Sequence, residues 1–408
     1  MNQFVEYSLM DAVEAIVDNR GRSCPTVPSG IPLIATNCLK LGQREPVLEN
    51  VRFVSQETYD SWFRAHPEPD DVLLVCKGNA GRVALVPDPV PFCIAQDMVA
   101  LRANRETAIG RYLYYRLLCA DVQASIVNMH VGTMIPHFKK GDFGRLRFSV
   151  HKSLDRQCAI ADVLGAIDDK IAVNTKLATT ADNYLSVLFE HALRDGGGEA
   201  TLRDIAEVNP EKRSPSNGML RYIDIASVGV GFFDFPKEMS WADAPGRARR
   251  GVRSGDIVWS TVRPNRRSHA LILDGNPSLV ASTGLAVIRS AEWPWVYEAM
   301  RRPEFTAYLE AVAEGSAYPA VRADKFLNAK LPVVDSAARE VFNELAAAVR
   351  SAVSLKMVEN RRLAATRDAL LPALMSGRLA VRDAEAAVER AVDSGAIEPE
   401  PVASGALW

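Results

Sequence analysis

Two stretches of this sequence, NTKLATTADNYLSVLFEHAL at residues 174–193 and NRRLAATRDALLPALMSGRL at residues 360–379, decide its fold because they repeat one another. Eight of the twenty aligned positions are identical, at a constant separation of 186 residues. These positions are Asn174/Asn360, Leu177/Leu363, Ala178/Ala364, Thr180/Thr366, Asp182/Asp368, Leu185/Leu371, Leu188/Leu374 and Leu193/Leu379. Self-similarity of this kind indicates that one structural unit occurs twice.

The repeat extends upstream, with small changes of separation that we assign to insertions in loops. The aligned pairs are GTMIPHFKKGDFGRLRF from Gly132 with GSAYPAVRADKFLNAKL from Gly315, DVLLVCKGNAGRVALV from Asp71 with DIVWSTVRPNRRSHALIL from Asp256, and IPLIATNCL from Ile31 with YIDIASVGV from Tyr222. The segments follow the same order in both halves. Each half mixes short apolar runs, bounded by Gly and Pro, with helical stretches. We therefore predict a duplicated α+β fold.

Both repeated stretches lie in long helices with a coiled-coil pattern. Apolar residues spaced alternately four and three apart form a seam through Ile160, Leu164, Ile167, Ile171, Asn174, Ala178, Ala181, Leu185 and Leu188. The second seam runs through Phe342, Leu345, Val349, Val353, Met357, Asn360, Ala364, Leu371 and Leu374, with a phase slip near Val353. A helix of roughly 40 residues is about 60 Å long. One such helix alone fits the core of an ordinary bundle equally well, but two copies favour antiparallel pairing with Asn174 and Asn360 setting the register.

The predicted organisation is two globular domains separated by two long antiparallel coiled-coil helices. The domains are 1–152 and 196–334, and the helices are 153–195 and 335–380. Residues 381–408 form an acidic tail, which we expect to be a short helix followed by a flexible segment, not a binding element. The glycine-rich segment at 195–201 is interpreted as a linker, because three glycines do not continue a helix.

Bulk composition excludes several classes of protein. The chain has 408 residues, a formal net charge of −2 and no apolar run long enough to cross a membrane. It begins without the basic and apolar regions of a signal peptide, so a cytoplasmic location is expected. The six cysteines contain no C-x-x-C pair, which favours reduced thiols over disulfides or a zinc site.

Basic residues gather in the second domain, where seven arginines stand against one acid between residues 247 and 269. The segment VRPNRRSHA contributes the candidate DNA contacts Arg263, Asn265, Arg266, Arg267 and His269. Arginine can bind guanine and asparagine can bind adenine through paired hydrogen bonds. The alternative is a solvated basic loop, or a site for the acidic surface of a partner.

Two further groups are candidates for DNA binding. One lies in a segment flanked by Gly and Pro, which we interpret as a loop facing phosphates; its members are Arg247, Arg249, Arg250 and Arg253. The other holds the corresponding position in the first half, within CKGNAGRVAL; its members are Lys77, Asn79 and Arg82.

No motif indicates that this chain is an enzyme. It lacks the G-x-x-x-x-G-K-[ST] loop that binds ATP, and a glycine-rich cofactor loop. Asn209-Pro210 is followed by Glu-Lys instead of the residues of an amino-methyltransferase motif. Its six histidines show no metal-ligand spacing. We expect neither a metal nor a cofactor in this chain.

With these features in place, the chain resembles the specificity subunit of type I restriction-modification enzymes over nearly its whole length. The segments that carry the resemblance are GIPLIATNCL from Gly30, IADVLGAIDDKI from Ile160, LRDIAEVNPEKR from Leu202, STGLAVIR from Ser282, GSAYPAVRADKFLNAKLPV from Gly315 and LLPALMSGRL from Leu370. The resemblance implies two target recognition domains, each reading half of a gapped double-stranded DNA sequence, with the helices setting the gap. It also implies two methyltransferase subunits and restriction/translocase subunits as partners, which would use S-adenosylmethionine, ATP and Mg.

Two other hypotheses remain open from the sequence. A coiled-coil scaffold derived from the same family would use the helices without reading DNA. An enzyme in its own right has no supporting motif.

Overall fold

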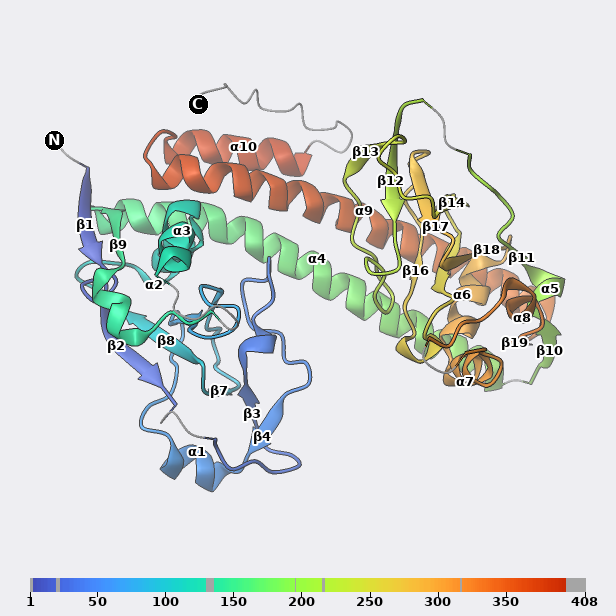
Figure 1. Ribbon diagram of the computed structural model, residues 1–408, viewed down its shortest axis with the longest axis horizontal. Helices are drawn as coiled ribbons and strands as arrows, with labels where there is room; N and C mark the ends of the chain where they lie inside the picture. Colours follow the sequence, from blue (N-terminus) through green and yellow to red (C-terminus); the bar gives the residue numbers. More distant parts are fainter. Residues whose placement is uncertain are drawn as a thin grey trace. The chain divides into compact units, whose positions relative to one another are not determined.

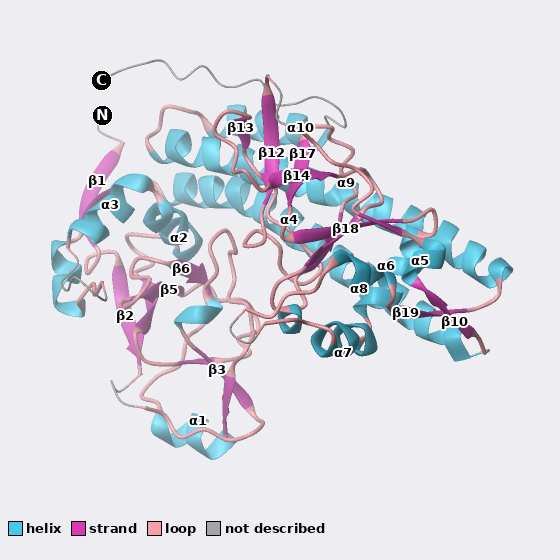
Figure 2. Cartoon of the chain, turned by 45° about the vertical axis from the view of Figure 1, so that its right-hand side comes forward, coloured by secondary structure: helices cyan, strands magenta, loops and turns pink. Residues whose placement is uncertain are grey.

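The computed structural model describes residues 3–19, 23–129, 136–194, 196–214, 217–315 and 318–393 (Figures 1 and 2). The chain forms two compact units: the first comprises residues 1–172 and 359–408, and the second comprises residues 173–358. Each unit contains one globular domain of helices and strands together with about half of each long helix. The α+β class predicted from the sequence is confirmed.

The first unit has three small sheets. The strands are β1 (Phe4–Ser8) paired with β9 (Arg147–His151); β2 (Val13–Asp18), β8 (Met98–Ala103), β5 (Val72–Val75) and β6 (Val83–Leu85) in that order; and β4 (Arg52–Val54), β3 (Ile31–Ile34) and β7 (Cys93–Ile94) in that order. The helices of its globular domain are η1 (Thr36–Cys38), α1 (Gln56–Trp62), α2 (Gly110–Leu118), α3 (Ala120–Asn128) and η2 (Lys140–Arg145).

The second unit repeats this plan. The strands are β10 (Gly198–Thr201) paired with β19 (Lys330–Val333); β11 (Glu207–Val208), β18 (Leu285–Arg289), β15 (Ile257–Ser260) and β16 (His269–Leu271); and β13 (Glu238–Ser240), β12 (Met219–Ile223), β17 (Leu279–Ser282) and β14 (Ala248–Gly251). Its shorter helices are α5 (Leu202–Ile205), η3 (Pro264–Arg266), α6 (Trp293–Arg301), α7 (Pro303–Ala311) and α8 (Ala323–Leu327).

A buried ion pair occurs at the same place in both units and confirms the predicted alignment of Asp71 with Asp256. Asp71, directly before β5, accepts two hydrogen bonds of 3.1 Å from Arg102 of β8. Asp256, directly before β15, accepts two from Arg289 of β18 at 2.8 and 2.7 Å. Both carboxylates are buried, and each pair ties two neighbouring strands together. The duplication therefore extends to individual side-chain contacts.

The predicted linker at 195–201 is wrong where the structure describes it. Gly198–Thr201 forms strand β10, which pairs antiparallel with β19 as β1 pairs with β9. A Cβ atom on Gly197 would lie only 2.3 Å from the carbonyl oxygen of Val333, so this glycine permits close approach of two backbones. Asp195 lies outside the described residues.

The aligned segments from Ile31 and from Tyr222 are out of register with the structure by two residues. Leu33 pairs with Cys93 and Tyr222 pairs with Val280, and these partners lie nine residues before Arg102 and Arg289 respectively. Leu33 therefore corresponds to Tyr222, whereas the sequence pattern had placed Ile31 there. A shift of two preserves the alternation of strand faces, which explains why the pattern matched at the wrong register.

The two long helices are α4 (Leu154–Arg194, 41 residues) and α9 (Ser336–Met375, 40 residues). In the first unit, Asp168 of α4 contacts Arg367 at 2.7 Å and the carbonyl of Ile171 accepts from Asn360 at 3.2 Å. The residue numbers of these contacts rise along α4 as they fall along α9. The two helices are therefore antiparallel in this unit, as predicted. In the second unit the same direction follows from the contacts of Asp182 with Arg350 and of Phe189 with Phe342.

Burial along the helices agrees with most of the predicted seam. Ile160, Leu164, Ile167, Leu185 and Leu374 are fully buried and Asn174 nearly so, while Ile171, Leu188, Met357, Asn360 and Leu371 are half-buried. Leu345 was assigned to the seam wrongly: it is 41% exposed, and the fully buried Ala346 takes its place. With Ala346 in the seam, the series Phe342, Ala346, Val349 and Val353 has the alternating spacing of four, three and four residues. The predicted phase slip is then confined to the residues after Val349.

The short helix predicted at the start of the tail 381–408 is present. Residues Val381–Asp393 form helix α10, whose Ala384 is fully buried in the core of the first unit. Val381, Ala387 and Val388 pack against the same core. Residues 394–408 lie outside the described part of the chain.

Two bulk properties can be checked directly. All six cysteines are free, as predicted. Among the described helices, none is both long and apolar enough to cross a membrane.

Candidate nucleic-acid interface

The β15–β16 loop of the second unit, residues 261–268, holds three of the arginines predicted to bind DNA, Arg263, Arg266 and Arg267. Arg263 and Arg267 adopt the left-handed backbone conformation on either side of the short helix η3. The N–H of Arg263 donates to the carbonyl of Pro319 at 2.8 Å, and the N–H of Thr261 donates to Gly284 at 3.0 Å. Backbone contacts to two other segments therefore hold this loop in one shape.

The first unit builds the corresponding β5–β6 loop on the same frame. The N–H of Gly78 donates to the carbonyl of Pro136 at 3.0 Å, and the N–H of Cys76 donates to Asp97 at 2.8 Å. Gly78 is also left-handed, at the position equivalent to Arg263. Pro136 and Pro319 are one of the pairs that the sequence repeat aligned. The two loops share a backbone frame and differ in their side chains.

Three predicted contacts lie at the surface of the β15–β16 loop. Asn265 and Arg266 are exposed, and Arg263 is half-buried. The guanidinium of Arg263 lies 4.8 Å from the ring centre of Tyr318, which is itself 69% exposed. The face of an aromatic ring attracts a cation and leaves the outer N–H groups free to donate. Tyr318 was not predicted, since a single tyrosine in a loop gives no signal in a sequence.

Arg267 and His269 hold the loop from inside. Arg267 donates to the carbonyl of Arg301, at the end of α6, at 2.6 Å. His269 is only 1% exposed, stacks on Trp259 at 4.4 Å, and places Nδ1 2.6 Å from the carbonyl of Arg267. Burial lowers the pKa of His269 to about 4, so the ring is neutral near pH 7. This burial contradicts the predicted contact between His269 and DNA.

Two members of the second arginine cluster lie in a strand instead of the predicted loop. Arg249 and Arg250 belong to β14 and are half-buried, and burial lowers the pKa of Arg250 below its usual value. Arg253 is exposed but binds Glu211 at 2.9 Å. Arg247, just before the strand, is exposed, and its carbonyl accepts from the N–H of Thr283.

One turn brings the two clusters together. The turn Ser282–Gly284 joins β17 to β18; it contacts Arg247 through Thr283 and the β15–β16 loop through Gly284. Arg247 therefore approaches the same turn as the loop that carries Arg263 and Arg266. The backbone at Arg247 and the start of the β15–β16 loop are therefore held by the same turn.

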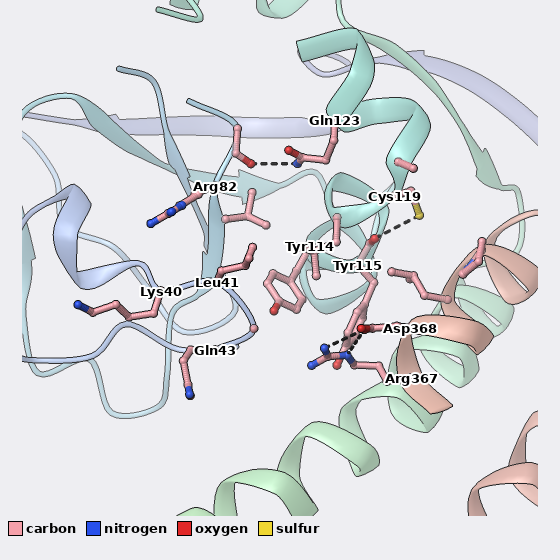
Figure 3. A pocket seen from close by; sticks show the side chains of 17 residues that line it. Lys40, Leu41, Gln43, Arg82, Tyr114, Tyr115, Cys119, Gln123, Arg367 and Asp368 are labelled. Atoms are coloured by element: carbon pink, nitrogen blue, oxygen red, sulfur yellow. Dashed lines mark hydrogen bonds and ion pairs between the residues drawn. The ribbon is translucent and has the colours of Figure 1, made fainter. Parts of the chain in front are cut away.

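The candidate DNA-binding residues of the first unit also divide into exposed and partly buried side chains. Lys77 and Asn79 are exposed on the β5–β6 loop. Arg82 donates to the carbonyl of Leu39 at 3.3 Å and lines a cavity of about 490 Å³ with Lys40 and Tyr114 (Figure 3). The far wall of this cavity comes from Arg367 and Asp368 of α9.

Each globular domain is fixed to both long helices within its own unit by a polar contact that the sequence did not indicate. In the first unit, Asp168 of α4 accepts from Tyr115 of α2 at 2.6 Å and from Arg367 of α9. In the second, Asp182 of α4 accepts from Arg301 of α6 at 2.5 Å and from Arg350 of α9 at 3.1 Å.

The family model for the type I restriction modification DNA specificity domain matches residues 47–181. This stretch of the chain is therefore similar to that specificity domain. The family is the non-catalytic DNA-recognition component of type I restriction-modification systems. Among the described residues, no group of three or more His, Cys, Asp or Glu side chains could hold a metal ion.

Two solved structures of specificity subunits match most of this chain. The type I S subunit from M. genitalium is 17% identical, with a TM-score of 0.53 over 91% of this chain and 96% of that one. The HsdS subunit from Thermoanaerobacter tengcongensis is 15% identical over 93% of this chain and 98% of that one, with a TM-score of 0.36. The first of these shows that the fold is shared. A comparison with curated protein sequences finds no match.

Proposed function

We propose that this chain reads a gapped, two-part DNA sequence and directs adenine methyltransferase and restriction subunits to it. The observation that carries the proposal is the shared backbone frame of the two reading loops. Equivalent hydrogen bonds hold both loops, yet the side chains on them differ, with Gly78 and Asn79 in one and Arg263 and Pro264 in the other. Two equal frames with unequal side chains suit the recognition of two different half-sites.

In the second domain, Arg266 and Asn265 are the residues best placed to read bases. Both are exposed on a loop of fixed shape, and their side chains can form paired hydrogen bonds to guanine and adenine in the major groove. Arg247 supplies a positive charge for a backbone phosphate. Lys77 and Asn79 take the corresponding roles in the first domain.

The long helices act as the spacer between half-sites. A helix of 41 residues is about 60 Å long, and each is fixed to a recognition domain by the contacts of Asp168 or Asp182. The distance between half-sites then depends on helix length, as half-site spacing depends on protein dimensions in other DNA-binding proteins.

The chemistry belongs to the partner subunits. A methyltransferase bound to this chain would flip an adenine in each half-site out of the stack and methylate it from S-adenosylmethionine. Restriction subunits would supply translocation and cleavage with ATP and Mg. This chain determines where on the DNA the partner subunits act.

Long-read mapping of methylated adenines in cells carrying the chain and its methyltransferase tests the proposal. We expect a motif of two defined parts separated by an undefined gap. Replacing Arg263 and Arg266 with alanine should abolish or relax only one part. Lys330→Ala, which removes an exposed lysine on β19, is the matched control and should leave the motif unchanged. A continuous motif would refute the two-part reading. The absence of any motif would refute it as well and would favour a scaffold that does not read DNA.

Inserting seven residues after Ala178 of α4 tests the spacer. We expect a changed gap, or loss of binding, with both half-sites unaltered. Altered half-sites with an unchanged gap would contradict the division of roles between domains and helices.

A further inference from the structure

Each globular domain carries an exposed apolar residue at the tip of one turn. In the first domain this residue is Leu41, which is 86% exposed, and in the second it is Val230, which is 56% exposed. Each residue precedes a glycine in the left-handed conformation, Gly42 or Gly231, which allows the chain to reverse directly after it. We call Leu41 and Val230 the apolar tips.

The two apolar tips hold the same position in the repeat. The separation of 189 residues that relates β3 to β12 also aligns Leu41 with Val230. The residues two positions earlier, Leu39 and Val228, are both buried in a core cluster. The flanking residues of the turns differ, with Lys40 and Gln43 in one and Gly229 and Phe232 in the other. One exposed apolar residue is ordinary, but its retention at one position of two unlike turns indicates a shared role.

Backbone hydrogen bonds hold both turns in place. In the first unit, the N–H of Gln43 donates to the carbonyl of Lys40 at 3.3 Å and closes the turn. In the second unit, the N–H of Gly231 donates to the carbonyl of His269 at 2.8 Å, and the N–H of His269 donates to the carbonyl of Gly229 at 2.8 Å. The apolar tips are therefore presented at fixed positions of their domains.

Each apolar tip lies beside the reading loop of its own domain. Leu41 lines the cavity of Figure 3 together with Gly81 and Arg82, the last residues of the β5–β6 loop. Arg82 also donates to the carbonyl of Leu39, two residues before the tip. In the second unit, His269 bonds the turn of the tip and directly follows the β15–β16 loop. DNA bound to a reading loop is therefore close to an apolar tip.

We propose that the apolar tips enter the base stack of the DNA at the place that the flipped adenine leaves. This inference rests on the proposed function, because it takes the half-site and its target adenine as the occupant. A flipped base leaves a gap between the apolar faces of the neighbouring base pairs, and proteins insert apolar side chains such as leucine between base steps. The tip shields these faces from water and so stabilises the flipped state.

The shared tips and the unlike reading loops then have separate roles. The reading loops differ because each half-site has its own sequence. Flipping an adenine is the same operation in both half-sites, so both tips are apolar. In the second domain Phe232, which is 59% exposed, adds another apolar side chain to the turn.

Methylation rates of the complete complex, on DNA with one of the two adenines already methylated, test each half-site in turn. Leu41→Ser should slow methylation in one half-site by about tenfold or more and leave the other unchanged. Val230→Ser combined with Phe232→Ser should slow only the other half-site. The matched controls are Leu48→Ser and Met219→Ser, which alter apolar residues that are 44% and 51% exposed but lie outside the turns. Both controls should keep the rates of the unaltered chain.

A mismatched base opposite the target adenine separates flipping from other roles. A mismatched adenine is easier to unstack, so the rate of Leu41→Ser on such DNA should return to within about threefold of the rate of the unaltered chain. An unchanged rate of Leu41→Ser on fully paired DNA would overturn the proposal. So would a slow rate that persists on mismatched DNA, which would indicate that the tip contacts a partner subunit instead of the base stack.

The fluorescence of 2-aminopurine, placed at the target adenine, reports flipping without any methylation. At saturating concentrations of the complex, Leu41→Ser should give a smaller increase in fluorescence than Leu48→Ser, and equal increases would contradict the role of the tip. Failure of the proposed function is distinguishable from failure of this inference. The absence of a gapped methylation motif would refute both, whereas a gapped motif with unchanged rates in the variants would refute only this inference.

Discussion

The neighbouring residues Arg266 and Arg267 allow a sharp test of how the reading loop works, because the sequence treats them alike and the structure separates them. Arg266 is exposed, so Arg266→Ala should change the free energy of unfolding by less than about 0.5 kcal/mol. Arg267 donates a hydrogen bond of 2.6 Å to the carbonyl of Arg301 from a half-buried position. A hydrogen bond made by a charged group contributes about 1.5–3 kcal/mol. We expect Arg267→Ala to lower the free energy of unfolding by that amount.

The effects on DNA binding should be of a different kind. If Arg266 contacts a base, its removal weakens binding of the cognate sequence by about 1–3 kcal/mol and relaxes one position of the motif. If it contacts a phosphate, binding weakens for all sequences and the slope against log salt falls by about 0.9. Arg267→Ala should weaken binding only through the loss of loop shape, with the salt slope unchanged.

Two assays measure these effects on each variant. Denaturant unfolding gives the stability, and fluorescence anisotropy of the complex with labelled DNA at several salt concentrations gives the affinity and slope. Arg267→Lys serves as a control, since lysine keeps the charge but lacks the forked donors of arginine; it should retain little of the lost stability. The reasoning is refuted if Arg266→Ala destabilises the protein by more than about 1 kcal/mol while Arg267→Ala does not.

Three further predictions concern stability. Leu363→Ala should cost about 2–5 kcal/mol of unfolding free energy because Leu363 is fully buried, whereas the repeat-related Leu177→Ala should cost less than about 1 kcal/mol; equal costs would contradict the difference in burial. His269 has a folded pKa of about 4, below its unfolded value, so the unfolded state binds more protons and stability should fall as pH falls from about 6.5 toward 4; denaturation of His269→Phe should show a shallower loss over this range. Asp256→Ala and Asp71→Ala each leave a paired arginine without its main partner and should each cost about 3–5 kcal/mol in thermal or chemical unfolding; a loss at only one of the two sites would show that the ion pairs are not equivalent.

Much of the fold could be predicted because helices and strands leave a periodic signal. The spacing of the apolar seam residues predicted α4 and α9. The identical positions shared by residues 174–193 and 360–379 revealed the duplication. Local patterns of this kind depend on neighbours a few residues apart. The strand β10 was missed because glycine removes the usual strand signal. A signal was present, since a side-chain hydrogen bond joins Ser8 to Asp11 and Thr201 to Asp204 near the start of each globular domain.

The candidate interface could be predicted less completely, because availability to DNA depends on burial. Composition placed His269 beside Arg266 in a basic loop, but the ring of Trp259 covers the histidine. It also separated Arg247 from Arg263, although Arg247 and the loop that carries Arg263 both contact the turn at Thr283 and Gly284. Both outcomes depend on contacts between residues distant in the chain, which no local pattern records.

The sequence by itself determined that one unit occurs twice, that two long helices accompany the units, and that no catalytic motif is present, since each of these follows from residue types at fixed spacing. Only the tertiary structure decided which of two repeat-related residues is buried and which is exposed. Leu177 and Leu363 are the same residue at the same place in the repeat, yet one is exposed and the other is buried in the core of the first unit, to which α10 contributes Ala384. Burial is set by what packs against a side chain, and α10 follows only one of the two helices.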